Sequence, residues 1–336
     1  MVKDLVTFGL FIIDSFYTVD DSGELIAQED LKDQIGGGGT YCALGARIWL
    51  HPSSIGMIVD RGHDFPEWIQ STLEQYGHDM WFFRDQPLET TRAANIYQAN
   101  DRGFKYLTPR IRLTPADIMS TTLAKPRYIH FICSPRRAEA ILREVDELGD
   151  DWAPITVYEP IPDRCVPEEL PILLKVIHRI HIFSPNAGEG LSLLSLPQPP
   201  TRTLIEQAAN SFLEFGAHSV IVRSGALGAY IKSSKDVPGQ WVEAYFTGNE
   251  ANRVIDVTGA GNAFLGGLVA GLVFSHGNLL EASLYATVSA SYMIEQYGLP
   301  RLTGSSGSSS DTGADERWNG EAPHQRLEKL RTRIVG

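Results

Sequence analysis

Short apolar runs alternate with amphipathic stretches along most of the chain. The apolar run at 6–13 ends on Asp14 and predicts a buried central strand, with an acid at the edge where α/β sheets hold ligands. The later runs and stretches give the β-α-β rhythm of an α/β fold, a doubly wound, mostly parallel sheet flanked by helices. We expect strands at 54–59, 78–83, 128–133, 155–158, 180–183 and 219–223, a strand pair at 229–231 and 241–245, and helices at 66–76, 136–148, 203–215, from 262 onward and at 279–297.

Three stretches depart from this rhythm within the single domain expected for residues 1–336. Residues 15–35 are polar and irregular, and residues 89–112 alternate polar and apolar positions around a turn at 101–103, as two exposed antiparallel strands do. We expect both to form a small β lid outside the core, with the run of four glycines at 36–39 beside it as a flexible joint. Residues 303–322 are rich in Gly, Ser and acidic residues and predict a mobile surface loop.

Composition and charge narrow the classes of function. The 336 residues, 43% of them hydrophobic, can fill a sizeable core. The net charge of −12 disfavours nucleic acid and anionic membranes as partners, because the summed field repels polyanions. Three scattered cysteines give no disulfide framework, and the histidines lack the spacing of a zinc site. The apolar N-terminal stretch is too short to span a bilayer. We expect a cytoplasmic protein that holds any anionic ligand locally.

The segment 256–264, DVTGAGNAF, is the strongest candidate for chemistry. Gly259 and Gly261 let a ligand approach the backbone, and the apolar helix that follows directs its unpaired N–H groups and positive dipole end at the turn. An isolated GAG triplet more often marks only a tight turn before a packed helix. The longer segment favours an anion site that holds the phosphates of a nucleotide.

The same segment resembles the C-terminal signature of the ribokinase-like (PfkB) carbohydrate kinases, and further motifs follow that family in order along nearly the whole chain. The resemblance implies ATP as cofactor with Mg²⁺, and a sugar or nucleoside as the small-molecule acceptor. It implies that Gly259, Ala260 and Gly261 form the anion hole. It also places Asp256 beside a monovalent-cation site, for which K⁺ is the expected ion.

The acceptor side of the resemblance lies near the N-terminus. Asp14 is similar to the acid that binds a substrate hydroxyl, although alone it would more often be a capping or turn residue. Gly37 and Gly38 are similar to the double glycine of the sugar site and lid hinge. The asparagine that contacts sugar in the family is replaced by Tyr41 or Cys42, depending on register. The identity of the sugar therefore does not carry over.

The nucleotide side of the resemblance lies in the second half. Asn186 and Glu189 match an N-x-x-E motif in which the glutamate orders Mg²⁺ through water, whereas alone they would be a helix cap and its first-turn acid. Gly225 and Gly228 match the glycines of a T-x-G-x-x-G loop on the phosphate side. Arg223 replaces the threonine of that loop, where it would either neutralise phosphate or pair with an acid.

One catalytic part of the family pattern is missing. Asn262 stands where the family has the aspartate that takes the acceptor's proton, and an amide cannot act as a base. A general base typically contributes about 10²–10⁴-fold, whereas positioning and electrostatics carry much of phosphoryl transfer. Glu159 and Ile161 also replace an aspartate and an asparagine of the family. The combination resembles a fungal branch linked to maintenance of a killer virus, which shares this asparagine.

Three functions remain open on these residues. The first is a phosphotransferase that binds a nucleotide and a sugar- or nucleoside-like hydroxyl compound, with catalysis weakened by Asn262. The second is a pseudokinase that keeps the ligands for a regulatory or scaffolding role. The third is a partner-binding module that forms a homodimer through the lid.

Overall fold

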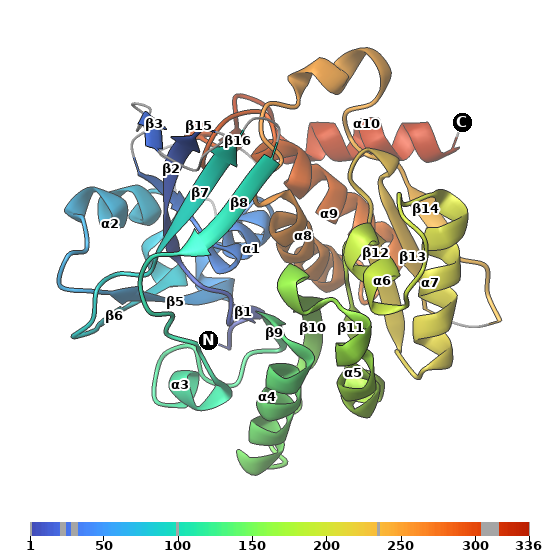
Figure 1. Cartoon of the computed structure of the whole chain (residues 1–336), viewed down its shortest axis with the longest axis horizontal. Helices are drawn as coiled ribbons and strands as arrows, with labels where there is room; N and C mark the ends of the chain where they lie inside the picture. The colour runs from blue at the N-terminus through green and yellow to red at the C-terminus, as the bar shows by residue number, and fades with distance from the viewer. Residues whose placement is uncertain are drawn as a thin grey trace.

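The computed structural model describes residues 2–20, 25–27, 33–98, 101–233, 236–303 and 316–335. At its centre is a nine-stranded sheet that runs across the molecule in Figure 1. Seven of its strands are parallel, and the last two pair antiparallel at one edge, which confirms the expected α/β fold. In spatial order the strands are β14 (Gln240–Val242), β13 (Ala229–Lys232), β12 (Ser219–Arg223), β11 (Ile182–Phe183), β10 (Ile155–Pro160), β9 (Tyr128–Cys133), β1 (Leu5–Thr7), β5 (Ile55–Arg61) and β6 (Trp81–Asp85).

The central strands are mostly apolar because helices cover both faces of the sheet. Successive residues alternate between two cores: Leu5 belongs to one and Val6 to the other, as do Val157 and Tyr158. The first core is closed by α1 (Gly38–Arg47), α2 (Glu67–Glu74), α8 (Ala260–Phe274), α9 (Leu279–Met293) and α10 (Pro323–Val335). The second is closed by α3 (Pro115–Met119), α4 (Pro135–Glu147), α5 (Leu170–Val176), α6 (Ala187–Leu193) and α7 (Arg202–Glu214).

A second, smaller sheet lies beside the main one and corresponds to the expected lid (Figure 1). Its order is β3 (Leu25–Ala27), β2 (Ile12–Val19), β7 (Arg92–Gln98) and β8 (Asp101–Tyr106), with β4 (Gln34–Gly36) also paired to β2. We call it the lid sheet. Residues 101–103, predicted as the turn of the hairpin, instead begin β8 and pair with the end of β7.

The predicted first strand at 6–13 is wrong as a single element. The chain leaves the main sheet after Thr7 and enters the lid sheet at Ile12. The crossing is made at Gly9, where a Cβ would lie 2.5 Å from the amide nitrogen of Gly39, so the two backbones touch. Asp14 is therefore a residue of the lid sheet, not the end of a central strand.

The glycine run at 36–39 is packed rather than a loose joint. Gly39 is buried against Gly9, and a Cβ on Gly36 would lie 1.8 Å from Oδ2 of Asp14. The missing side chains allow β4 to approach Asp14 of β2 and α1 to approach the segment between β1 and β2, which is a reason for glycine that composition does not reveal.

The predicted loop at 303–322 is only partly described. Residues 304–315 lie outside the described residues. On either side, β15 (Leu302–Thr303) pairs with β16 (Arg317–Trp318), and Trp318 is fully buried. In addition, Glu316 forms an ion pair with Arg47 at 2.6 Å. The described end of this segment is thus part of the core. In the described ranges as a whole, none of the helices combines the length and apolar character needed to cross a membrane.

Candidate functional site

The acceptor end of the candidate site is a buried carboxylate on the lid sheet. Asp14 is 6% exposed, and its Oδ1 accepts a hydrogen bond of 3.1 Å from Nδ2 of Asn95 on the neighbouring strand β7. Asn95 is itself 1% exposed. Nothing in the sequence marks Asn95, because its selection depends on the pairing of β2 with β7 across 81 residues of chain.

The glycine pair predicted for the sugar site opens helix α1. Gly37 is the N-cap, with φ of 95°, a left-handed conformation that favours glycine. A Cβ on Gly38 would lie 3.1 Å from Nδ2 of Asn262. The structure therefore brings the predicted sugar-site glycines and the predicted base position together.

The predicted anion turn begins the 15-residue helix α8. Gly259 is its N-cap with φ of 76°, and the ring of Tyr41 covers it, since a Cβ there would lie 2.2 Å from Cγ of Tyr41. No side chain of the described residues caps this helix, and its first turn, which includes Ala260 and Gly261, carries no acid. The N–H groups and the positive dipole end of α8 therefore meet no carboxylate of their own, which is the arrangement that suits an anion.

The residue before this turn also has a defined place. Oδ1 of Asp256 accepts hydrogen bonds from the backbone N and the Oγ1 of Thr258, at 3.0 and 2.8 Å. The carboxylate thus shapes the approach to Gly259. The monovalent cation expected beside Asp256 stays a prediction.

Asn186 and Glu189 form a reciprocal capping box at the start of α6. Oδ1 of Asn186 accepts from the backbone N of Glu189 at 2.8 Å, and Oε2 of Glu189 accepts from the backbone N of Asn186 at 2.7 Å. Burial, opposed by the charge of Arg223 and reinforced by that of Glu159, raises the pKa of Glu189 to about 7. The capping interpretation of the motif is confirmed, and the ligand role predicted for Glu189 rests on the resemblance alone.

Arg223 ends β12 and crosses the centre of the site. Its Nη1 lies 2.8 Å from Oε1 of Glu159, and its Nη2 donates to the backbone oxygen of Ser184 at 3.0 Å. Nη2 is also 3.7 Å from Oε2 of Glu189. A Cβ on Gly261 would lie 2.1 Å from Nη1, so the guanidinium rests directly on the anion turn. Of the two interpretations left open for Arg223, pairing with an acid is confirmed.

The two glycines that follow Arg223 shape the turn between β12 and β13. Gly225 has φ of 53° and begins a short 3-10 turn, η6 (Gly225–Leu227). Gly228 has φ of 90°, and a Cβ there would lie 2.0 Å from the backbone oxygen of Val242 on β14. Their role on the phosphate side stays a prediction.

Glu159 at the end of β10 joins these residues into one network. Its Oε2 accepts from Nδ2 of Asn262 at 2.8 Å and lies 3.5 Å from Nε2 of His130. Burial alone would raise the pKa of Glu159, but Arg223 and the other polar neighbours outweigh burial, so the pKa lies below its ordinary value. An ionised carboxylate therefore holds the amide group of Asn262.

Two members of this network were not identified from the sequence. His130 on β9 is fully buried, and its Nδ1 lies 2.9 Å from Oγ1 of Thr7 on β1. These residues and Glu159 come from neighbouring parallel strands, β1, β9 and β10. The sequence signal that could have identified them is a polar residue within an otherwise apolar strand. The carboxyl ends of parallel strands meet at one edge of the sheet, so such residues lie close together there.

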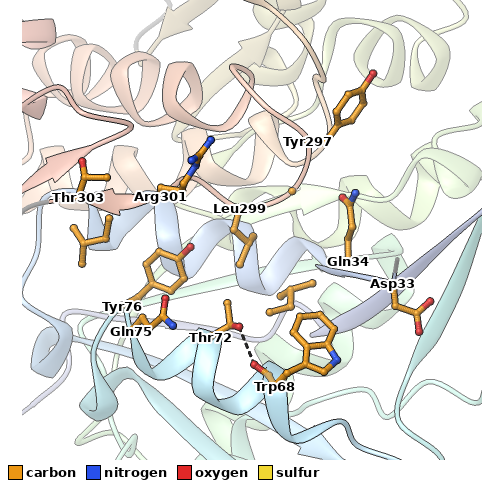
Figure 2. A pocket seen from close by; sticks show the side chains of 13 residues that line it. Asp33, Gln34, Trp68, Thr72, Gln75, Tyr76, Tyr297, Leu299, Arg301 and Thr303 are labelled. Atoms are coloured by element: carbon orange, nitrogen blue, oxygen red, sulfur yellow. Dashed lines mark hydrogen bonds between the residues drawn. The ribbon is translucent and has the colours of Figure 1, made fainter. Parts of the chain in front are cut away.

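The chain also has a pocket that these residues do not line. It has a volume of about 510 Å³ and lies between α2, residues 33–35 and residues 297–303. Figure 2 shows Trp68 and Thr72 on the helix side, with Tyr297 and Arg301 across from them. Neither Asp14 nor any residue of the Glu159 network is among its lining residues.

The site residues fit a divalent cation poorly. Across the described parts of the chain, no group of three or more His, Cys, Asp or Glu side chains could hold a metal ion. The carboxylates of Glu159 and Glu189 both face the guanidinium of Arg223. The guanidinium of Arg223 therefore already occupies the place to which these two carboxylates could attract a metal cation.

Comparison with known proteins supports the resemblance found in the motifs. The pfkB family carbohydrate kinase model matches residues 2–301. An uncharacterized protein of Schizosaccharomyces pombe is 34% identical over 347 residues, which cover 97% of this chain and 92% of that protein. Protein MAK32 of Saccharomyces cerevisiae is 31% identical over 316 residues, 88% of this chain and 87% of its own. Both are fungal, as is the branch that the motifs resemble.

A solved structure gives the same fold. The ribokinase of Cryptococcus neoformans in complex with ADP matches with a TM-score of 0.67 at 20% identity, covering 89% of this chain and 96% of that one. Taken with the family match over most of the length, these likenesses show that the chain belongs to the PfkB family of carbohydrate kinases.

Proposed function

We propose that this chain binds a nucleotide with its phosphates at Gly259–Gly261 and a sugar- or nucleoside-like hydroxyl compound at Asp14, and that it transfers the phosphoryl group slowly. The family and the uncapped N-terminus of α8 support the nucleotide half. The ADP bound to a ribokinase of the same fold points the same way.

The acceptor half rests on Asp14. A carboxylate that is 6% exposed and bonded to a buried amide keeps a fixed orientation and can accept a hydrogen bond from a hydroxyl group. The amide of Asn95 adds a second polar group of the kind that distinguishes a polyol from an apolar ligand. The acceptor class is therefore a compound with several hydroxyl groups.

The observation that carries slow transfer is the bond from Nδ2 of Asn262 to Oε2 of Glu159, at 2.8 Å. The amide is committed to a carboxylate, and an amide nitrogen cannot take a proton. Glu159 itself is engaged by Arg223, so it is held as a countercharge. Transfer then depends on positioning and charge neutralisation without a base.

The test measures ADP formation from ATP with a panel of pentoses, hexoses and nucleosides. The variants are the natural chain, Asp14→Asn, and Asn262→Asp combined with Glu159→Gln, which restores a base without creating two adjacent carboxylates. We expect slow turnover with one acceptor class, loss of that turnover in Asp14→Asn, and a gain of about 10²–10⁴-fold in the double variant.

Two results would redirect this proposal. If ATP binds by calorimetry but no acceptor supports turnover in either the natural chain or the double variant, the protein is a pseudokinase. If ATP fails to bind, the nucleotide site itself is refuted. Asn278→Asp, at an exposed helix N-cap, makes the same chemical change elsewhere and should leave turnover unchanged.

The lid sheet supports a second proposal, a homodimer. Phe104 on β8 is 53% exposed, and Leu107, which follows the end of β8, is 47% exposed. The outer strand and the residue after it therefore present apolar side chains to solvent. Sedimentation of the natural chain and of Phe104→Ser tests this pairing. A monomer at micromolar concentration in the natural chain contradicts it.

A further inference from the structure

Among the residues that the structure describes, Arg223 is the one cation that faces both Glu159 and Glu189. Its Nη1 pairs with Glu159 at 2.8 Å, and its Nη2 lies 3.7 Å from Glu189. The side chain is 10% exposed. The threonine of the family pattern at this position carries no charge, so the cation is a property of this chain.

The guanidinium is incompletely satisfied. Nη1 and Nη2 have the partners given above, but Nε of Arg223 is buried and has no hydrogen-bond partner among the described residues. A buried N–H without a partner is costly, because it has lost water and gained nothing in exchange. An acceptor atom supplied by a ligand would remove that cost.

The position of the guanidinium indicates the ligand's charge. Nη1 lies against Gly261, in the first turn of α8, and no acidic side chain occupies that turn. Fixed positive charge from Arg223 and the positive dipole end of α8 therefore converge on one place. Phosphate oxygens are the acceptors that this combination suits, and a guanidinium can bind them through two N–H groups.

The same position disfavours a divalent cation. Glu159 and Glu189 would have to attract a metal through the field of a guanidinium that already pairs with them. A second cation would repel Arg223, or would have to displace it from Glu159. Phosphate neutralisation can instead be carried out by the protein alone.

We propose that Arg223 takes the place of the divalent ion, so that this chain binds nucleoside di- and triphosphates free of metal. This inference rests on the proposed nucleotide site and specifies how its phosphates are neutralised. Glu159 acts as a positioning residue that keeps the guanidinium on the anion turn until phosphate arrives.

The experiment measures ADP binding by calorimetry, once in EDTA and once in excess Mg²⁺. The natural chain should bind in both, with dissociation constants within about threefold of each other. Arg223→Thr, which installs the family residue, should weaken binding in EDTA by about ten- to a hundredfold, the effect of one lost charge-assisted contact. Its affinity in Mg²⁺ should fall less, because the metal can then approach the two glutamates.

Matched variants separate charge from folding. Arg127→Thr removes an exposed arginine that immediately precedes β9, at the amino ends of the parallel strands, and should bind as the natural chain does. Arg223→Lys keeps the charge and should retain binding in EDTA better than Arg223→Thr. If Arg223→Thr does not fold, the natural chain and Arg223→Lys still decide the question.

The outcomes distinguish this inference from the nucleotide site. Binding of ADP by the natural chain in Mg²⁺ but not in EDTA overturns the metal-free inference and leaves the nucleotide site intact. Equal binding in EDTA by Arg223→Thr and the natural chain also overturns it. Absence of binding under both conditions overturns the nucleotide site and the inference together.

Discussion

The substitution Asn262→Asp returns the family's proton acceptor to this site and also creates a partly buried pair of carboxylates. Nδ2 of Asn262 lies 2.8 Å from Oε2 of Glu159, which is 6% exposed. With charge centres about 4 Å apart and an effective dielectric constant of about 20, two carboxylates repel by about 4 kcal/mol. That energy corresponds to about three pKa units, so we expect one carboxyl group of the pair to stay protonated near pH 7.

The sign of the resulting pH dependence follows from the raised pKa. The folded protein holds a proton that the unfolded chain releases above its ordinary carboxyl pKa, so the stability of the variant falls as the pH rises. At pH 8 the free energy of unfolding of Asn262→Asp should lie below that of the natural chain by up to about 4 kcal/mol, with Arg223 offsetting a part. At pH 5 the deficit should be smaller.

Urea unfolding at pH 5 and pH 8 measures this difference. Adding Glu159→Gln should restore the stability of Asn262→Asp at pH 8, because one of the two charges is removed. Asn278→Asp should cost little at either pH, since Asp and Asn cap helices equally well. If Asn262→Asp is equally stable at both values, or if Glu159→Gln does not restore it, the carboxylate pair argued from the structure does not exist.

Three further substitutions test other parts of the structure. Arg326→Ala removes a fully buried guanidinium 2.7 Å from Glu295, and it should lower the free energy of unfolding by about 3–5 kcal/mol; an unchanged urea midpoint contradicts this. Gly259→Ala forces a side chain into φ of 76° against the ring of Tyr41, so thermal unfolding should show a lower Tm and calorimetry weaker ADP binding. K⁺ should raise the Tm of the natural chain above its value in choline chloride, and Asp256→Asn should abolish that rise; equal values in both salts argue against a cation site.

Hydrophobic periodicity predicted the main sheet well because its strands are buried on both faces. The strands at 128–133 and 219–223 match β9 and β12 residue for residue. The run at 6–13 was wrongly predicted as one strand because apolar residues fill both β1 and the start of β2. The chain passes from one strand to the other at Gly9, where it contacts Gly39. That contact joins segments thirty residues apart, which periodicity does not record.

The motifs indicated where along the chain the candidate site residues lie. They did not indicate which of these residues contact one another. Gly38 and Arg223 both lie against the first turn of α8, the turn that carries Asn262. The link through Glu159 could be located only in three dimensions, because its partners come from different strands and helices. His130 lies within the strand predicted at 128–133, and the sequence pattern does not show which partner a buried polar side chain meets there.

The early departure of the chain from the main sheet has a mechanical consequence. Asp14 belongs to the lid sheet, whereas Asn262 belongs to α8, which packs on the main sheet. An acceptor that contacts both residues would be held between the lid sheet and the main sheet. The affinity for such an acceptor would then depend on the angle between the two sheets, which a change on the outer strand β8 would alter.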